Sequence, residues 1–125
     1  MTQKDILFML PPGFADRNRR EFCPECAELW GVLAWYPALQ PALDIRYQPI
    51  HKPRAQMTTM LGDNHQNCPT LILSPHSPHI GKAGIKTANG HHFIDNARDM
   101  AVYFAHRYGT PFPRGHAVNQ TGATE

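Results

Sequence analysis

The segment Phe22-Cys23-Pro24-Glu25-Cys26 places two cysteines three residues apart at the expected start of a helix. Pro24 suits a first helical position, because a residue there needs no backbone N–H for the helix. The residues that continue the segment recur at the spacing of one buried helix face: Cys26, Leu29, Trp30 and Leu33. Pro37 then ends the helix near Tyr36. The segment therefore predicts a cysteine pair held on the first turn of a helix.

This placement gives the two cysteines different chemistry. The free N–H groups and the positive dipole end of a helix N-terminus favour the thiolate of Cys23, and the thiolate is the nucleophile. Cys26, one turn later on the apolar face, is placed to attack a mixed disulfide at Cys23 and release the substrate. A structural metal site needs a second cysteine pair or a histidine pair at ligand spacing, and the sequence has neither. The pattern therefore favours thiol–disulfide exchange.

Around this segment, hydrophobic periodicity predicts alternating strands and helices. The predicted elements are a buried strand over 5–10, the helix over 24–36, a strand over 43–47, a helix from Pro53 to Gly62, strands over 70–73 and 91–94, and a helix capped by Asp95 or Asn96 and ended by Gly109. Residues 11–22 read as a polar loop, and residues 75–90 read as a connection too long for a tight hairpin. The order β-α-β-α-β-β-α predicts a three-layer α/β/α sandwich around a four-stranded mixed sheet, with the first two strands parallel and the last two antiparallel.

Length and composition narrow the class of protein further. A chain of 125 residues is long enough for one hydrophobic core, which we assign to a single domain over 1–113, followed by a frayed polar tail over 114–125. A formal net charge of +2 is too weak to indicate nucleic acid or an anionic membrane as a partner. No signal peptide or membrane span is visible, so a cytoplasmic location is expected, where cysteines stay largely reduced.

A second segment, Asn67-Cys68-Pro69-Thr70-Leu71, completes a resemblance to the thioredoxin-like superfamily. Both of that superfamily's signatures are present: an aromatic-Cys-Pro-x-Cys segment after the first strand and a proline just before the third strand. The resemblance implies a thioredoxin-like fold in which Pro69 is cis and faces the cysteine pair. It also implies that the backbone of Cys68 pairs with bound peptide or glutathione.

Within the superfamily, the sequence is more similar to glutaredoxins and to the N-terminal half of glutathione S-transferases. Phe93-Ile94-Asp95-Asn96 stands where those proteins hold the γ-glutamyl end of glutathione with an acidic residue and a serine. The resemblance implies glutathione as a co-substrate, bound through Asp95 and Asn96. An ordinary N-cap is the alternative for Asn96.

The charge balance near the motif is the next expectation. Glu25 disfavours ionisation of Cys23, because a like charge lies nearby. Three arginines in the preceding loop are expected to offset it and to attract an anionic thiol: Arg17, Arg19 and Arg20. A solvated basic loop is the alternative. The histidines at 76, 79, 91 and 92 are expected to be solvated rather than metal ligands.

The segments Leu10-Pro11-Pro12-Gly13-Phe14 and Ala105-His106-Arg107-Tyr108-Gly109 resemble a family of small bacterial thioredoxin-like proteins known only as a domain of unknown function. This likeness covers residues 5–113 and implies a fold without an activity. The leading hypothesis is a thiol–disulfide oxidoreductase with Cys23 attacking and Cys26 resolving. The alternative is a non-catalytic binding module of the same fold that holds a metal through Cys23, Cys26 and Cys68.

Overall fold

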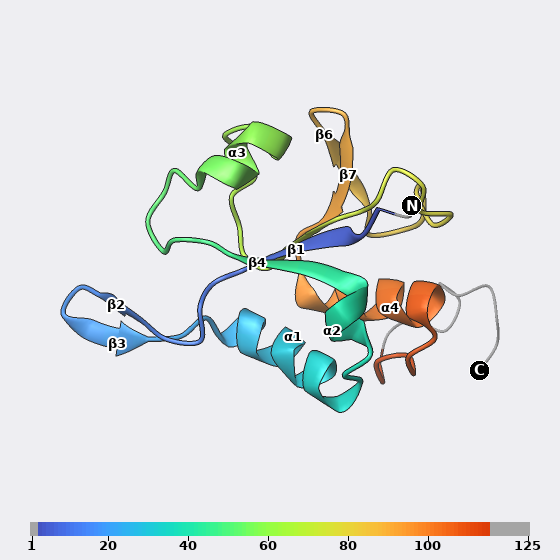
Figure 1. Ribbon diagram of the computed structural model, residues 1–125, viewed down its shortest axis with the longest axis horizontal. Coiled ribbons are helices and arrows are strands. Elements are labelled where there is room, and N and C mark those ends of the chain that lie inside the picture. The colour runs from blue at the N-terminus through green and yellow to red at the C-terminus, as the bar shows by residue number, and fades with distance from the viewer. Residues whose placement is uncertain (1–2, 116–125) are drawn as a thin grey trace.

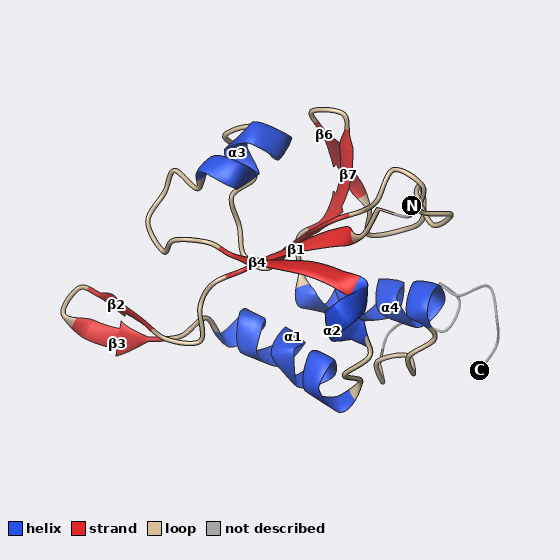
Figure 2. Cartoon of the chain, viewed as in Figure 1, coloured by secondary structure: helices blue, strands red, loops and turns tan. Residues whose placement is uncertain are grey.

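A computed structural model describes residues 3–115 of the chain. Over these residues the fold is α/β, with a five-stranded mixed sheet, a separate two-stranded hairpin and four helices (Figures 1 and 2). The elements in chain order are β1 Asp5–Met9, β2 Phe14–Asp16, β3 Arg19–Glu21, α1 Pro24–Trp35, α2 Leu39–Ala42, β4 Leu43–Tyr47, α3 Ala55–Leu61, β5 Thr70–Ile72, β6 Lys86–Ala88, β7 His91–Ile94 and α4 Ala97–Tyr108.

The strand β1 lies at the interior of the sheet, which has the order β4-β1-β5-β7-β6. All five of its residues are buried, as the unbroken apolar run predicted for a strand covered on both faces. It pairs in parallel with β4, from Asp5 opposite Leu43 to Met9 opposite Tyr47, and antiparallel with β5. The predicted parallel crossover through α1 and the predicted antiparallel pairing of β5 with β7 are both confirmed.

The helices cover both faces of the sheet. Figure 1 shows α1 and α4 side by side below the strands and α3 above them, and contacts between α1 and α4 agree with that view. The largest fully buried side chains come from the strands and from these three helices: Phe8, Phe93, Phe104, Leu7, Met9, Leu29, Leu33, Met57, Leu71, Ile94, Met100 and Thr70. The core therefore fixes the ends of α1 and α4 relative to the central strands.

Residues predicted as a polar loop, 11–22, contain the hairpin β2–β3 instead. Arg17 and Asn18 form its turn with positive φ angles of 50° and 61°, the geometry of the two-residue turns that join antiparallel strands. The hairpin has intermediate or exposed residues only, and in Figure 1 it projects away from the main sheet. Its strands were missed because hydrophobic periodicity reports burial, and this hairpin buries little.

The predicted four-stranded sheet was wrong by one strand. β6 pairs with β7 through the turn residues Asn89 and Gly90, which have φ angles of 50° and 80°. Asn-Gly is a strong signal for a tight hairpin, so the interpretation of 75–90 as one long connection overlooked a local clue. The short helix α2 was also not predicted. Residues 116–125 of the predicted tail lie outside the described part of the chain.

Within residues 3–115, none of the helices has the length and apolar character needed to span a bilayer.

Candidate functional site

Cys23 is the N-cap of α1, as the sequence predicted. Its backbone is extended, and its Sγ accepts a hydrogen bond of 3.1 Å from the backbone N–H of Cys26. Pro24 occupies the first turn, and the carbonyl of Cys23 accepts the N–H of Ala27 at 3.0 Å. The Cys23 side chain is half-buried. A thiolate at this atom would therefore receive one backbone hydrogen bond and the favourable end of the helix dipole.

Cys26 is more deeply buried than Cys23. Its side chain is buried beneath the first turn of α1, and both cysteines are free thiols. Burial raises the pKa of the Cys26 thiol from 9.0 to about 12, and the hydrogen bond and charge of Cys23 act in the same direction. A hydrogen bond with the backbone of Leu10 lowers it in part. At neutral pH Cys26 is therefore a protonated thiol in contact with Cys23.

The third cysteine lies against the same site. The Cys68–Pro69 peptide bond is cis, which confirms that prediction, and the thiol of Cys23 donates to the carbonyl oxygen of Cys68 at 3.8 Å. The Cys68 thiol itself is buried and lies 3.8 Å from the sulfur of Met57. The structure thus brings Cys68 to Cys23 through its backbone, while its side chain faces α3.

A buried arginine, missed by the sequence analysis, lies beside Cys68. Arg54 is only 6% exposed and donates to the carbonyl oxygens of Pro49, Ile50 and Gln66 at 2.5 to 2.8 Å. No carboxylate of residues 3–115 forms an ion pair with it. Burial raises the pKa of Cys68 to about 11, while the charge of Arg54 opposes that shift and Cys23 adds to it. The contact depends on tertiary structure, so the local sequence pattern carried no signal for it.

An apolar groove opens next to the cysteine pair. It has a volume of about 90 Å³. No charged residue lines it, and its walls come from the end of β1, the loop after it, the start of α1 and the end of β4: Met9, Leu10, Pro11, Pro12, Phe22, Cys23, Cys26, Ala27, Trp30 and Tyr47. Phe22 and Tyr47 remain 60% and 46% exposed. The groove therefore offers an uncharged surface directly beside the Cys23 thiol.

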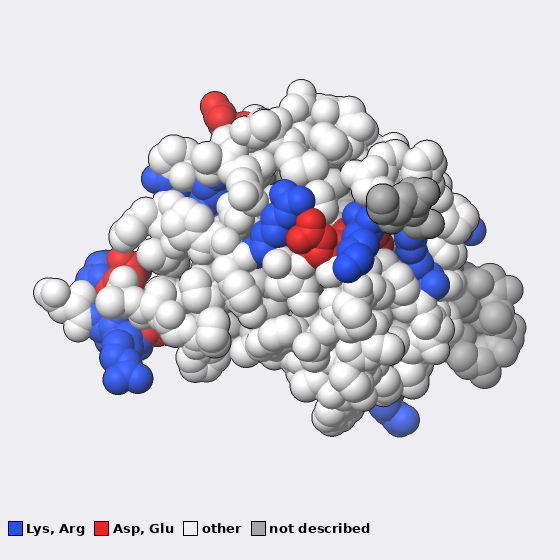
Figure 3. Space-filling model, in the orientation of Figure 1, with Lys and Arg blue, Asp and Glu red and all other residues white. Residues whose placement is uncertain are grey.

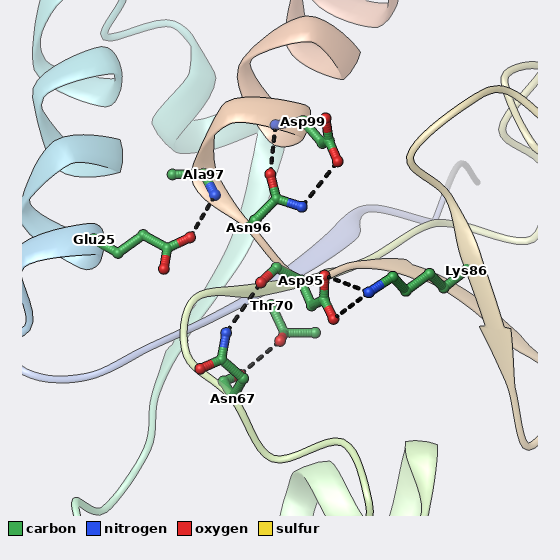
Figure 4. Close-up of polar contacts among 8 residues, drawn as sticks. All are labelled: Glu25, Asn67, Thr70, Lys86, Asp95, Asn96, Ala97 and Asp99. Atoms are coloured by element: carbon green, nitrogen blue, oxygen red, sulfur yellow. Dashed lines mark hydrogen bonds and ion pairs between the residues drawn. The ribbon is translucent and has the colours of Figure 1, made fainter.

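A polar cluster joins α1, the loop before β5 and the start of α4 (Figure 4). Glu25 accepts a 2.8 Å hydrogen bond from the backbone N–H of Ala97. Asn67 donates to the carbonyl oxygen of Asp95 at 3.0 Å, and Thr70 donates to the carbonyl oxygen of Asn67. These bonds place the residues around Cys68 and Pro69 next to the N-terminus of α4.

The two residues assigned to the γ-glutamyl end of glutathione already have protein partners. Asn96 caps α4, since its side chain accepts the N–H of Asp99 at 2.8 Å and donates to the Asp99 carboxylate at 2.9 Å. The N-cap alternative is confirmed. Asp95 forms an ion pair of 2.9 Å with the ammonium group of Lys86 on β6 (Figure 4). Lys86 was missed because β6 itself was missed.

The three arginines lie on the β2–β3 hairpin. Figure 3 shows basic and acidic side chains gathered there at one end of the molecule. Arg17 lies 3.7 Å from Asp16, and Arg19 lies 3.1 Å from Glu21. Arg20, on β3, is exposed. At least two of the three charges therefore have an acidic neighbour within the hairpin, in addition to solvent.

Within residues 3–115, no group of three or more histidine, cysteine or acidic side chains is arranged to hold a metal ion. Cys23, Cys26 and Cys68 are close in space but do not form such a group. Among the described residues, these three cysteines are therefore not arranged as the ligands of the metal site that the sequence analysis considered.

Comparison with known proteins places the chain in a family. The model of the family described as "Protein of unknown function (DUF3088)" matches residues 4–112. The match covers most of the 125 residues, so the chain belongs to the DUF3088 family. No curated protein and no solved structure shows significant similarity to the chain.

Proposed function

We propose that this member of the DUF3088 family is a thiol–disulfide oxidoreductase that uses Cys23 as nucleophile and Cys26 as resolving cysteine. The observation that carries the proposal is the N-cap geometry, in which the Cys23 sulfur accepts the N–H of Cys26 at 3.1 Å. A sulfur in this position has its negative charge stabilised by the helix N-terminus and stays open to a partner, since its side chain is only half-buried.

The unequal burial of the two thiols supports the assignment of roles. Cys23 as thiolate attacks one sulfur of the substrate disulfide, forms a mixed disulfide and displaces the other substrate sulfur as a thiolate, which takes up a proton. Cys26, whose pKa burial has raised to about 12, stays protonated until this stage. It then loses its proton, attacks the Cys23 sulfur and releases the second substrate thiol. The substrate gains two electrons, and the protein is left with a Cys23–Cys26 disulfide.

The arrangement of elements supports a thioredoxin-like fold for this chemistry. Without β6 and the hairpin, the chain has the order β-α-β-α-β-β-α, counting α1 and α2 as one helical connection. The first two main-sheet strands are parallel, and β7 is antiparallel to β5, as expected for that superfamily. The contact of Cys23 with the Cys68 carbonyl joins its two signature segments. We take these features as support for the resemblance and keep the fold name as part of the proposal.

The surroundings of Cys23 also suggest what the partner looks like. The groove beside it is uncharged, so it suits an apolar side chain flanking the substrate disulfide. Glutathione remains the proposed small thiol that regenerates the reduced pair. The resemblance assigns its γ-glutamyl end to Asp95, so glutathione bound there would displace the ammonium group of Lys86 from this carboxylate.

The test is a redox titration of the purified chain in mixtures of reduced and oxidised glutathione. The free thiols of Cys23 and Cys26 should disappear together in one two-electron transition. The ratio of oxidised to reduced protein should then change tenfold for each change of about 30 mV in the potential of the glutathione mixture. Cys23→Ser, and Cys26→Ser combined with Cys68→Ser, should each abolish this transition, whereas Cys68→Ser alone is the matched control and should keep it. If Cys23 and Cys26 stay reduced across the whole range of mixtures, the proposed function is wrong.

A further inference from the structure

A second and larger cavity lies between the 79–85 loop and α4. Its volume is about 320 Å³. It shares no lining residue with the groove beside Cys23. The lining side chains combine charged, aromatic and aliphatic groups: His79, Lys82, Ala83, Ile85, Asp99, Val102, Tyr103 and His106. A cavity of this volume is at the lower end of the range for small-molecule sites.

The charges in this cavity are separated along the axis of α4. Asp99 lies in the first turn of the helix and His106 in the last. Seven helical residues at about 1.5 Å each separate them by roughly 10 Å. The Asp99 carboxylate accepts the side-chain N–H of Asn96, and a β-carbon placed on Gly84 would come within 3.0 Å of it. The acidic end is therefore closed by the loop, and the other end carries the histidines.

The histidine end of the cavity lies near cationic side chains. The rings of His79 and His106 lie 6.0 Å apart, and the ring of Tyr103 lies 5.9 Å from His79 in an edge-to-face contact. Burial lowers the pKa of His79, and His106, Arg107 and Lys82 each lower it further. The negative charge of Asp5 acts in the opposite direction and raises the pKa of His79.

The charge of Asp5 is already taken up by protein groups. Its carboxylate is fully buried and accepts hydrogen bonds from Tyr103, Tyr108 and the backbone N–H of Ser74. Arg107 lies 3.6 Å from the same carboxylate. Lys82 forms no ion pair with a carboxylate of residues 3–115. An anion entering the cavity would therefore meet the ammonium group of Lys82 and the imidazole rings of His79 and His106.

We propose that this cavity binds a small organic monoanion, a carboxylate, a sulfate ester or a phosphate diester, with its charged head at the histidine end. The aliphatic body of the ligand would lie on Val102 and Ile85. Asp99 at the opposite end disfavours a second anionic group about 10 Å from the first. The site therefore selects ligands with one charged end and one apolar end, and it is independent of the cysteine chemistry.

The test uses benzenesulfonate, whose single charge does not change over the pH range of histidine titration, and neutral benzenesulfonamide as its matched control. In ¹H–¹⁵N and ¹H–¹³C NMR titrations of the full chain, benzenesulfonate should shift the signals of His79, Val102 and Tyr103 and leave those of Cys23 unmoved. Its affinity should rise as the pH falls and His79 takes up a proton, because a protonated imidazole adds a positive charge to the cavity. Benzenesulfonamide should bind more weakly and without this dependence on pH.

Variants separate the proposed site from general surface charge. His106→Gln and Lys82→Gln remove exposed side chains and should each weaken benzenesulfonate binding about three- to fivefold, the size expected of an exposed ion pair. Arg17→Gln on the distant hairpin is the matched control and should leave binding unchanged. Cys23→Ser should bind as the natural chain does, so this test is separate from that of the proposed function. Equal binding of benzenesulfonamide, or unchanged affinity in both His106→Gln and Lys82→Gln, would overturn the proposal.

Discussion

The carboxylate of Glu25, inside the cysteine motif, accepts a 2.8 Å hydrogen bond from the backbone N–H of Ala97, the first residue of α4. From the sequence, this charge was expected to act mainly on Cys23. In the structure the Glu25 carboxylate instead lies at the N-terminus of α4, where a negative charge is favourable. The first turn of α1 is thereby joined to the start of α4.

Glu25→Gln should lower the free energy of unfolding by about 1 kcal/mol, since it replaces a charged acceptor at a helix N-terminus with a neutral one. Glu25→Ala should cost more, about 1–3 kcal/mol, because the N–H of Ala97 loses its partner. Urea denaturation followed by circular dichroism measures both. Glu28→Gln is the matched control, because Glu28 also joins α1 to α4 but through an exposed pair with Arg98. A larger loss for Glu28→Gln than for Glu25→Gln would contradict this account.

Alkaline pH should destabilise the chain through its buried thiols. Burial raises the pKa of Cys26 from 9.0 to about 12 and that of Cys68 to about 11. Well below pH 9 the thiols are protonated in both states and add no pH dependence. As the pH approaches and passes 9, the unfolded state releases protons that the folded state keeps, and stability falls as pH rises.

The slope should approach about 1.4 kcal/mol per pH unit for each buried thiol as the pH rises past the unfolded pKa. The measurement is urea denaturation with reductant present from about pH 8 to 10, a range that spans the onset of thiol ionisation in the unfolded chain. Cys26→Ala should show a shallower slope than the natural chain. Parallel curves for the two proteins would show that Cys26 is not held in its protonated form by the fold.

The buried Asp5 cluster should be a major source of stability. Asp5 is 0% exposed and binds Tyr103 at 2.6 Å, Tyr108 at 2.8 Å and the backbone N–H of Ser74 at 2.7 Å. Asp5→Ala leaves these donors and the charge of Arg107 without an acceptor and should cost about 3–5 kcal/mol. Asp44→Ala removes a half-exposed pair on β4 and should cost far less. Thermal unfolding compares the two; similar losses would refute the importance of the cluster.

Cys68 should compete with Cys26 for Cys23 once Cys26 is removed. The Cys68 carbonyl already touches the Cys23 thiol, and rotation of the Cys68 side chain away from Met57 would bring its sulfur toward the same atom. Oxidised Cys26→Ser protein should therefore contain a Cys23–Cys68 disulfide by peptide mass mapping. Only intermolecular dimers in that sample would count against it, and Cys26→Ser with Cys68→Ser supplies the control.

The hairpin arginines should have a small, salt-dependent effect on the reaction with anionic disulfides. Replacing Arg17, Arg19 and Arg20 with Gln should slow reduction of an anionic disulfide about two- to fivefold at low salt and leave a neutral disulfide unaffected, because exposed charges act at a distance and are screened. Stopped-flow rates at several ionic strengths provide the measurement, with Arg98→Gln as control. An unchanged salt dependence would make the hairpin's charge irrelevant to the chemistry.

The sequence by itself determined the elements that bury apolar faces. Burial leaves a pattern along the chain, and that pattern was sufficient to place three elements. They are β1, from its unbroken apolar run, β4, from its alternation, and α1, from the helical spacing after Cys23. Local chemistry also placed Cys23 at the start of a helix and limited the cap of α4 to Asp95 or Asn96, of which the structure selects Asn96. The exposed hairpin β2–β3 leaves no such pattern. The turn at Asn89-Gly90 does have a local signal, which the interpretation of 75–90 as one connection overlooked.

Only the tertiary structure decided how the polar groups are partnered. Glu25 meets Ala97 72 positions later, and Arg54 lies beside Cys68 because the chain folds back between them. Such contacts depend on where helices end in space, and a periodic pattern carries no information on that. The separation of the two cavities has the same cause: α4 presents its first residue to the cysteine motif and the side of Val102 and His106 to the 79–85 loop.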